Sequence, residues 1–147
     1  MTLKDQLVAD IEAARIEAKR KRRATLPDHE WWEEVREAEI KPALDEAALA
    51  FRETQLGGNS ETRNGGSGVA LLAGHSEPPI HYLAFTHVAG KIKVTSSEPS
   101  IDERWDRKHA TLEAVVSKIR DFARLIAAKI QPESVYERRG VITVDVD

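Results

Sequence analysis

Apolar residues recur at every third or fourth position near the N-terminus, a spacing that predicts a helix over residues 3–22. Thr2 directly precedes this segment and can cap it with its hydroxyl group. The apolar stripe is mostly alanine after Ile11, so the predicted helix holds little core of its own and must pack on something else. The stripe consists of Leu3, Leu7, Ile11, Ala14 and Ala18.

A second helical pattern begins around Pro27-Asp28, with acidic residues in its first turns, as a helix N-terminus favours. It carries two apolar stripes that do not share one register. Pro42 lies at the break between them, and proline both removes a backbone donor and clashes with the preceding turn. We therefore expect a kink there, or two helices that meet. The first stripe is Trp31, Val35 and Ala38, and the second is Ile40, Leu44, Ala47, Ala48 and Phe51.

Residues 57–68 hold five of the eight glycines in the chain and predict a loop. A loop of this length in a small domain is either functional or mobile. It separates a helical part, residues 1–56, from a part with a sheet and a helix, residues 69–147. Because neither part has enough partners to close a core alone, we expect residues 1–147 to form a single domain.

Several strand patterns follow this loop. Residues 69–73 are apolar on both faces, as in a strand that is flanked by two others. Residues 80–88 and 91–95 alternate between apolar and polar side chains, which is typical of strands with one face in the core. Residues 141–146 alternate in the same way and predict a final strand. We expect these four strands to lie in the spatial order 3-2-1-4.

The Ala89-Gly90 pair predicts a two-residue hairpin turn between the second and third of these strands. Such a turn places Phe85 opposite Val94, and His87 opposite Ile92. The opposite face of the hairpin is then at least half solvated. The face directed to the core carries His81, Leu83, Phe85, Ile92 and Val94.

Ser100 and Glu103 have the spacing of a capping box, which predicts that a helix begins there and continues to about residue 130. A helix over residues 101–130 is about 45 Å long, whereas a seven-residue strand spans about 23 Å. The overhang needs a partner, either the N-terminal helices or another subunit. The sequence thus predicts an α+β fold: an antiparallel β-meander of about four strands, covered by one long helix, with an N-terminal helical hairpin packing on it.

The composition excludes several classes of protein. The chain has no cysteine, which rules out disulfides, zinc–thiolate sites, iron–sulfur clusters and thiol nucleophiles. Its net charge of −3 gives no general attraction to nucleic acid or to acidic membranes. The apolar runs are too short to span a bilayer, and the N-terminus lacks the hydrophobic region of a signal peptide. We therefore expect a cytoplasmic protein with no cofactor and no membrane partner.

The run Lys19, Arg20, Lys21, Arg22, Arg23 is the most prominent charged motif. One interpretation is a patch that binds nucleic acid or phosphate. The other is structural: cations at a helix C-terminus complement the helix dipole, and the acidic residues of the next segment are close enough to neutralise them. No aromatic residue is interleaved with the run to stack on bases, which favours the structural interpretation.

Metal, catalytic and ligand sites are only weakly indicated. His75, Glu77 and His81 surround one turn and could share a metal, although a solvated turn is the simpler interpretation. No nucleophile with a neighbouring base and no catalytic carboxylate pair stands out, so we favour a non-catalytic protein. A small-molecule pocket between sheet and helices, lined by His81, Phe85 and Trp105, is a further alternative.

Two adjacent tryptophans, Trp31 and Trp32, point about 100° apart on a helix, so they cannot both face one core. With Val35, they mark a surface for another protein, or else Trp32 lies beneath a neighbouring helix of the same chain. Together with the helix overhang and open strand edges, they favour a non-catalytic interaction module that acts as a homo-oligomer, preferably a dimer. A nucleic-acid-associated protein and a small-molecule binder or enzyme are the alternatives.

Overall fold

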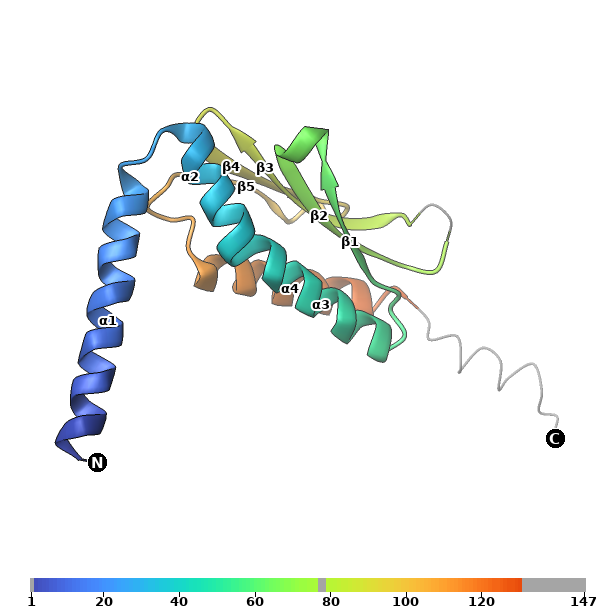
Figure 1. Cartoon of the computed structure of the whole chain (residues 1–147). Coiled ribbons are helices and arrows are strands. Elements are labelled where there is room, and N and C mark those ends of the chain that lie inside the picture. Colours follow the sequence, from blue (N-terminus) through green and yellow to red (C-terminus); the bar gives the residue numbers. More distant parts are fainter. Residues whose placement is uncertain (1, 77–78, 131–147) are drawn as a thin grey trace.

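In residues 2–76 and 79–130, the part of the chain that the computed structural model describes, five antiparallel strands form one sheet with helices on one face (Figure 1). The strands lie in the order β1-β2-β3-β4-β5, so each pairs with its neighbours in sequence. The predicted α+β class and antiparallel meander are confirmed. The strands are β1 (Asn59–Arg63), β2 (Gly68–Ala73), β3 (His81–Val88), β4 (Lys91–Ser96) and β5 (Asp102–Trp105), and the helices are α1 (Leu3–Ala24), α2 (Asp28–Val35), α3 (Lys41–Glu53) and α4 (Leu112–Ala127).

The N-terminal helix begins where the sequence predicts and extends two residues beyond the predicted end. The Thr2 hydroxyl accepts a hydrogen bond from the Asp5 N–H at 3.2 Å, and the Asp5 carboxylate accepts one from the Thr2 N–H, so Thr2 is the expected cap. No residue of α1 is buried. The helix projects away from the sheet and from the other helices, and it adds nothing to the core (Figure 1).

The second helical region is one helix with a π-helical turn, η1 (Arg36–Ile40), between α2 and α3. The Lys41 N–H donates to the Arg36 carbonyl, five residues back, and Pro42 has no N–H with which to continue the ladder. The wider turn holds one extra residue. It therefore brings the two mismatched stripes onto the same side, and Val35, Ile40 and Leu44 are all buried.

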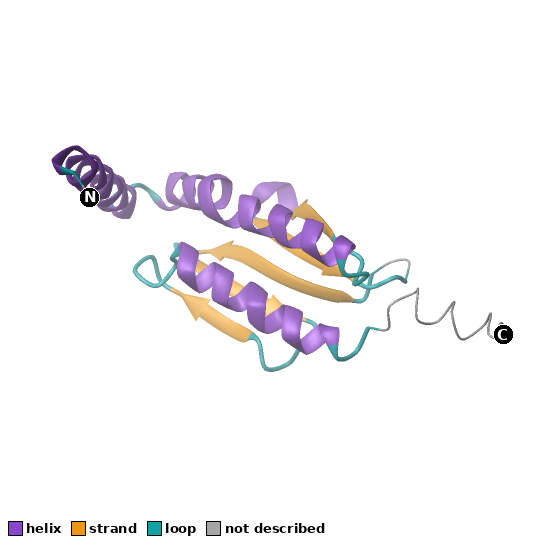
Figure 2. Ribbon diagram, turned by 90° about the horizontal axis from the view of Figure 1, so that it is seen from below, coloured by secondary structure: helices purple, strands orange, loops and turns teal. Residues whose placement is uncertain are grey.

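Figure 2 shows α2 to α3 and α4 lying side by side over the same face of the sheet. The Phe51 ring of α3 and the Phe122 ring of α4 are 6.2 Å apart, and the Phe85 ring of β3 lies 5.8 Å from the Trp105 ring of β5. These contacts close one core between helices and sheet. None of the helices in the described ranges combines the length and apolar character needed to cross a membrane.

The prediction that residues 57–68 form a loop is wrong. Residues 59–63 form β1, which pairs with β2, and a short 3-10 turn, η2 (Asn64–Gly66), joins the two strands. Strand β1 is polar and lies at the sheet edge, so it carries no apolar alternation that could reveal it. Strand β2 is flanked on both sides as expected, but β1 occupies the position that the order 3-2-1-4 gave to residues 141–146, which lie outside the described residues.

The hairpin of β3 and β4 has the predicted register, with Phe85 opposite Val94 and His87 opposite Ile92. Ala89 and Gly90 form the turn, with φ angles of 50° and 78°. Four of the predicted core residues are completely buried, whereas His81 is half-buried. The four are Leu83, Phe85, Ile92 and Val94.

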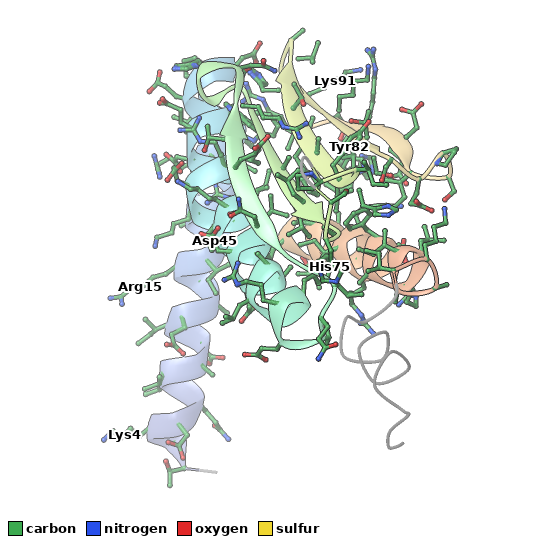
Figure 3. The ribbon with its side chains drawn as sticks, turned by 90° about the vertical axis from the view of Figure 1, so that its right-hand side faces the viewer. Lys4, Arg15, Asp45, His75, Tyr82 and Lys91 are labelled. Carbon is green, nitrogen blue, oxygen red and sulfur yellow. The ribbon has the colours of Figure 1, made fainter. Side chains whose placement is uncertain are left out.

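Among the described residues, no helix lies over the opposite face of the sheet (Figure 1). Apolar residues there form a separate minor cluster of Ala70, Leu72 and Ala84, against which Tyr82 packs. The Arg63 guanidinium lies 5.6 Å from the centre of the Tyr82 ring, and Figure 3 shows Tyr82 and Lys91 on this side of the molecule. The prediction of a half-solvated second face is therefore confirmed.

The predicted helix over residues 101–130 is wrong in its first third. Residues 102–105 form β5, which pairs with β4 and carries Trp105 into the core. The helix begins later, at Leu112, where the Thr111 hydroxyl accepts a hydrogen bond from the Ala114 N–H at 3.2 Å. At 16 residues α4 is about 24 Å long, close to the length of the strands it covers, so the argument for an overhang does not hold.

Candidate functional site

The tryptophan pair lies inside the chain's own core. Trp31 and Trp32 are 2% and 1% exposed, and Val35 is equally buried, so these residues offer no surface to a partner. The Trp32 Nε1–H donates to the Gly66 carbonyl at 2.7 Å, and the same oxygen accepts from the Arg36 guanidinium at 2.5 Å. The Trp32 indole is therefore buried within the same chain, but it lies against the β1–β2 connection and not beneath a neighbouring helix as the alternative predicts.

Two residues of the predicted ligand pocket pack against each other, and only two of the three predicted metal ligands, His75 and His81, lie in the described residues. Phe85 and Trp105 are in ring contact, while His81 lies four residues along β3 with its Nδ1 atom buried and without a hydrogen-bond partner among the described residues. The His75 Nε2–H donates a hydrogen bond to the Gln55 carbonyl, 2.7 Å away. Glu77 lies outside the described residues, and within them no three potential ligands could hold a metal ion.

The basic run is largely neutralised by acidic residues. Arg23 donates to Glu39 at 2.5 Å, and Arg22 pairs with Glu34 at 3.2 Å across the turn between α1 and α2. Arg20 forms a looser ion pair with Glu17 at 3.6 Å. In the described part of the chain, Lys19 and Lys21 take no part in an ion pair. Nucleic-acid binding by the run therefore stays a prediction. The two lysines and Arg20 are exposed.

A long exposed apolar surface lies on α1 instead. Leu3 is 70% exposed, and Leu7 and Ile11 are each 49% exposed. With Ala14 and Ala18 these residues form one stripe along the helix, which we call the α1 seam. A monomeric protein rarely leaves a whole helix stripe uncovered, so the seam is a candidate interaction surface.

Arg107 holds α1 to the rest of the described chain near the C-terminal end of the helix. The Arg107 guanidinium donates to the Ala24 carbonyl at 3.2 Å, to the Leu26 carbonyl at 2.5 Å and to the Asp28 carboxylate at 2.6 Å. The same group lies 5.0 Å from the centre of the Trp31 ring, a cation–π contact. Arg107 therefore fixes the connection between α1 and α2 against the segment that precedes α4.

A cavity of about 680 Å³ lies where α1 meets the segment before α4. We call it the basal cavity. It brings together three residues of the basic run and Trp31, which the sequence analysis had placed in two different sites. Its lining is Ile16, Glu17, Arg20, Lys21, Arg23, Ala24, Trp31, Glu39, Arg107, Lys108, Ala110, Thr111, Leu112 and Glu113.

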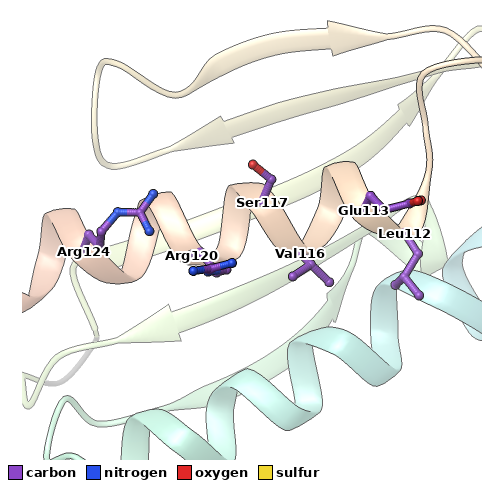
Figure 4. A pocket seen from close by; sticks show the side chains of 6 residues that line it. All are labelled: Leu112, Glu113, Val116, Ser117, Arg120 and Arg124. Carbon is purple, nitrogen blue, oxygen red and sulfur yellow. The ribbon is translucent and has the colours of Figure 1, made fainter.

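A shallower depression runs from the basal cavity along α4 and shares Leu112 and Glu113 with it. In Figure 4, Leu112, Val116 and Arg120 leave the helix on one side and form a row. Leu112 and Val116 are both exposed. The apolar lining of the basal cavity therefore continues along the helix surface.

Sequence reasoning missed the residues that α4 and its preceding segment contribute, namely Arg107, Lys108 and Leu112. They fall in the region that was assigned to the middle of a long helix. The single available signal was Thr111, a good capping residue placed directly before an apolar run. Nothing in their local pattern indicates that they meet α1, about 80 positions earlier.

His87, on β3, is in ring contact with both Trp31 and Trp32. Its ring stacks on the Trp32 indole, with 5.6 Å between ring centres and an angle of 10° between the planes. Burial lowers the pKa of His87 from its usual value, and the positive Arg107 and His29 side chains act in the same direction, against the attraction of Asp28. The neutral ring is therefore favoured in the folded state.

A second perturbed pair joins the sheet to α4. Lys118 donates to the Glu103 carboxylate, which also accepts from the Trp105 Nε1–H at 2.9 Å. Hydrogen bonds from Lys118 and Trp105 lower the pKa of Glu103, and the Glu103 carboxylate raises the pKa of Lys118. The pair fastens the edge strand β5 to α4 but lies on the surface, away from the basal cavity.

Comparison with known proteins adds no relative. No protein-family model matches the sequence, and no curated protein and no solved structure is similar to it. The α1 seam and the basal cavity are thus assigned on their own geometry.

Proposed function

We propose that the protein is a non-catalytic interaction module that forms a homodimer through parallel pairing of two α1 helices. The observation that carries the proposal is the α1 seam, an apolar stripe on a 22-residue helix with no buried residue. A helix of this length is marginal in water without tertiary packing, so a partner that covers the seam explains why it exists.

The seam has the spacing of a short coiled coil. In a heptad written a to g, Leu7 and Ala14 occupy d positions, and Ile11 and Ala18 occupy a positions. The steps from Leu7 to Ala18 are four, three and four residues, which is the alternation that keeps one stripe facing a neighbouring helix. The two alanines at the C-terminal end allow two helices to approach closely there.

The flanking charges favour a parallel over an antiparallel partner. In a parallel pair each g position faces the e position five residues later on the other helix. Asp10 then faces Arg15 of the second copy, and Glu17 faces Arg22. An antiparallel pair would place the acidic g residues opposite one another and the arginines likewise. Leu3 and Val8, the remaining g and e residues, add an apolar pair at the N-terminal end.

The placement of α1 leaves the seam open to a second copy. At about 100° per residue, the seam lies on average about 120° round the helix from the residues that line the basal cavity. Figure 3 shows Lys4 and Arg15 leaving α1 on the same side, away from the sheet and the other helices. Two copies in parallel would therefore meet along α1 on a side that shares Glu17 and Lys21 with the lining of the basal cavity.

Sedimentation equilibrium at high micromolar concentration tests the dimer. We expect the wild type to dimerise and Leu7→Ser to weaken the dimer by at least about tenfold, because the lost burial of about 1.5–3 kcal/mol counts in both copies. Ile16→Ser is the matched control, since Ile16 is equally exposed on α1 but lies outside the seam. A compact monomer at high micromolar concentration contradicts the proposal.

Charge exchange tests the orientation. Asp10→Arg places two arginines opposite each other in a parallel dimer, and Arg15→Asp places two aspartates opposite each other, so each single variant should weaken the dimer. The double variant restores opposite charges and should regain wild-type affinity. Recovery in the double variant cannot come from an antiparallel pair, where the g positions would meet one another. Failure of the double variant to recover contradicts the parallel arrangement.

A further inference from the structure

We propose that the basal cavity binds an amphipathic monoanion: a molecule with an aliphatic or aromatic body and one carboxylate, sulfonate or phosphate group. The inference does not need the dimer, because most of the lining lies outside the seam, although Glu17 also takes a g position in the proposed dimer and Lys21 the next d position. It assigns a role to the cations and apolar residues that the proposed dimer leaves unused.

The size and walls of the cavity suit a small amphipathic molecule. Its volume of about 680 Å³ falls in the range of small-molecule sites, about 300–1,000 Å³. Trp31 and Ala110 form a buried apolar part of the lining, and Ile16 and Leu112 are exposed apolar residues at its rim. The adjoining depression along α4, with Val116, gives room for a longer apolar body (Figure 4).

The charges in the lining leave a small positive excess. The carboxylate of Glu39 is bound by Arg23, and that of Glu17 by Arg20, while Arg107 is held by Asp28 and two backbone carbonyls. Among the described residues of the lining, the charged side chains that remain are Lys21, Lys108 and Glu113. One uncompensated cation matches a ligand with one negative charge better than a polyanion.

Arg23 also has a donor that the described residues do not satisfy. Its Nε atom is buried and makes no hydrogen bond to them, and the Glu34 oxygen is 3.6 Å away. A buried N–H without an acceptor is costly, so such atoms call for an explanation. An acceptor oxygen of a bound anion would satisfy this donor.

The walls that would orient the ligand are held in place without it. Arg107 ties the segment before α4 to the turn after α1 through three hydrogen bonds and covers one side of the Trp31 ring. A site that is already formed loses little free energy to ordering when a ligand enters.

Fluorescence titration with 1-anilinonaphthalene-8-sulfonate tests the site, because this probe joins an aromatic body to one sulfonate. We expect saturable binding that sodium decanoate displaces, and weaker binding of the uncharged probe N-phenyl-1-naphthylamine. Lys108→Glu should weaken the anilinonaphthalene sulfonate by about tenfold, since it reverses a charge in the lining. Lys91→Glu is the matched control, because Lys91 is an exposed lysine on β4 that is not part of the cavity lining.

A second variant and the seam variant separate this site from other apolar surfaces. Leu112→Glu should weaken binding in the same way, because Leu112 is exposed at the rim and its replacement leaves the core intact. Leu7→Ser should bind the probe as the wild type does. Equal binding by the wild type and Lys108→Glu, or loss of binding in Leu7→Ser alone, would overturn the proposal.

Anionic vesicles show whether the monoanion is free or a membrane lipid. Co-sedimentation with vesicles of phosphatidylcholine and phosphatidylglycerol that Lys108→Glu abolishes, together with decanoate displacement, supports a lipid as the source. Decanoate displacement without vesicle binding supports a free molecule. Vesicle binding without any displacement by decanoate contradicts the proposal, because the site would then not recognise the monoanion itself.

Discussion

The His87 Nε2 atom accepts a hydrogen bond from the Gly90 N–H at 3.1 Å, so the side chain closes the very turn that ends its own strand. An imidazole nitrogen can accept only when it carries no proton, which places the ring proton of the neutral form on Nδ1. The contact therefore joins the charge state of one side chain to the geometry of the β3–β4 turn.

This contact predicts a loss of stability on mild acidification. Because the pKa of His87 is lowered in the folded state, the unfolded chain binds more protons between the two pKa values, and the free energy of unfolding falls as the pH drops below about 6.5. Urea unfolding at pH 8, 6.5 and 5 measures this. His87→Gln should be less stable at pH 8 but should lose less on going to pH 5. An identical loss in the variant would show that other groups cause it.

The pair of Glu103 and Lys118 predicts a dependence at lower pH. The pKa of Glu103 is lowered by folding, so its contribution is complete above about 4.5 and is lost as the pH falls through the folded-state pKa. We expect Glu103→Gln to lower the free energy of unfolding by about 1 kcal/mol or less at pH 7, since solvent screens this surface pair. At pH 3 the variant and the wild type should differ less. A difference that does not change between pH 7 and pH 3 contradicts this assignment.

Two neighbouring glycines predict unequal costs of the same substitution. Both Gly65 and Gly66 have positive φ, but a Cβ at Gly66 would lie 2.9 Å from the Arg36 guanidinium, whereas a Cβ at Gly65 meets nothing within 4 Å. Gly65→Ala should cost about 1 kcal/mol from the backbone alone. Gly66→Ala should cost more, because Arg36 must move from the Gly66 carbonyl. Thermal unfolding of the two variants compares them. Equal melting temperatures would show that the contact with Arg36 does not raise the cost of Gly66→Ala.

A substitution on α4 tests the single core between helices and sheet. Phe122 is completely buried against Phe51, so Phe122→Ala should lower the free energy of unfolding by about 3–5 kcal/mol. Val116→Ala, on the exposed side of the same helix, should cost well under about 1 kcal/mol. Chemical denaturation measures both. A small effect at Phe122 would mean that α4 is not anchored in the core.

The parts of the fold that could be predicted are those with strong local patterns. The hairpin register follows from the alternation around Ala89-Gly90, because a two-residue turn allows only one pairing. The polar strand β1 has no such pattern. Its position follows only from β2, which is apolar on both faces and therefore lies between two other strands. The capping-box spacing of Ser100 and Glu103 is present, but pairing with β4 and burial of Trp105 outweigh it.

The candidate sites differ in the same way. The α1 seam is visible in the sequence as a thin stripe that needs a partner, and its exposure in the structure agrees with that interpretation. The basal cavity is not visible, because Arg20, Trp31 and Lys108 come from three segments whose proximity depends on tertiary packing. The tryptophan pair suggests a surface for a partner, but the Trp32 indole N–H donates to the Gly66 carbonyl of the same chain. The sequence pattern does not show that Gly66 lies beside this helix.

The number of residues in the π-helical turn η1 determines how the helices before it are rotated relative to α3. It holds one residue more than a regular helix would need between α2 and α3. Deleting one residue from 36–40 would let the helix continue regularly, but it would turn everything before the deletion by about 100°. Trp32 would then leave the Gly66 carbonyl, and α1 would point in another direction. The count of residues in this turn, and not only their identity, sets the direction in which α1 projects from the sheet and the other helices.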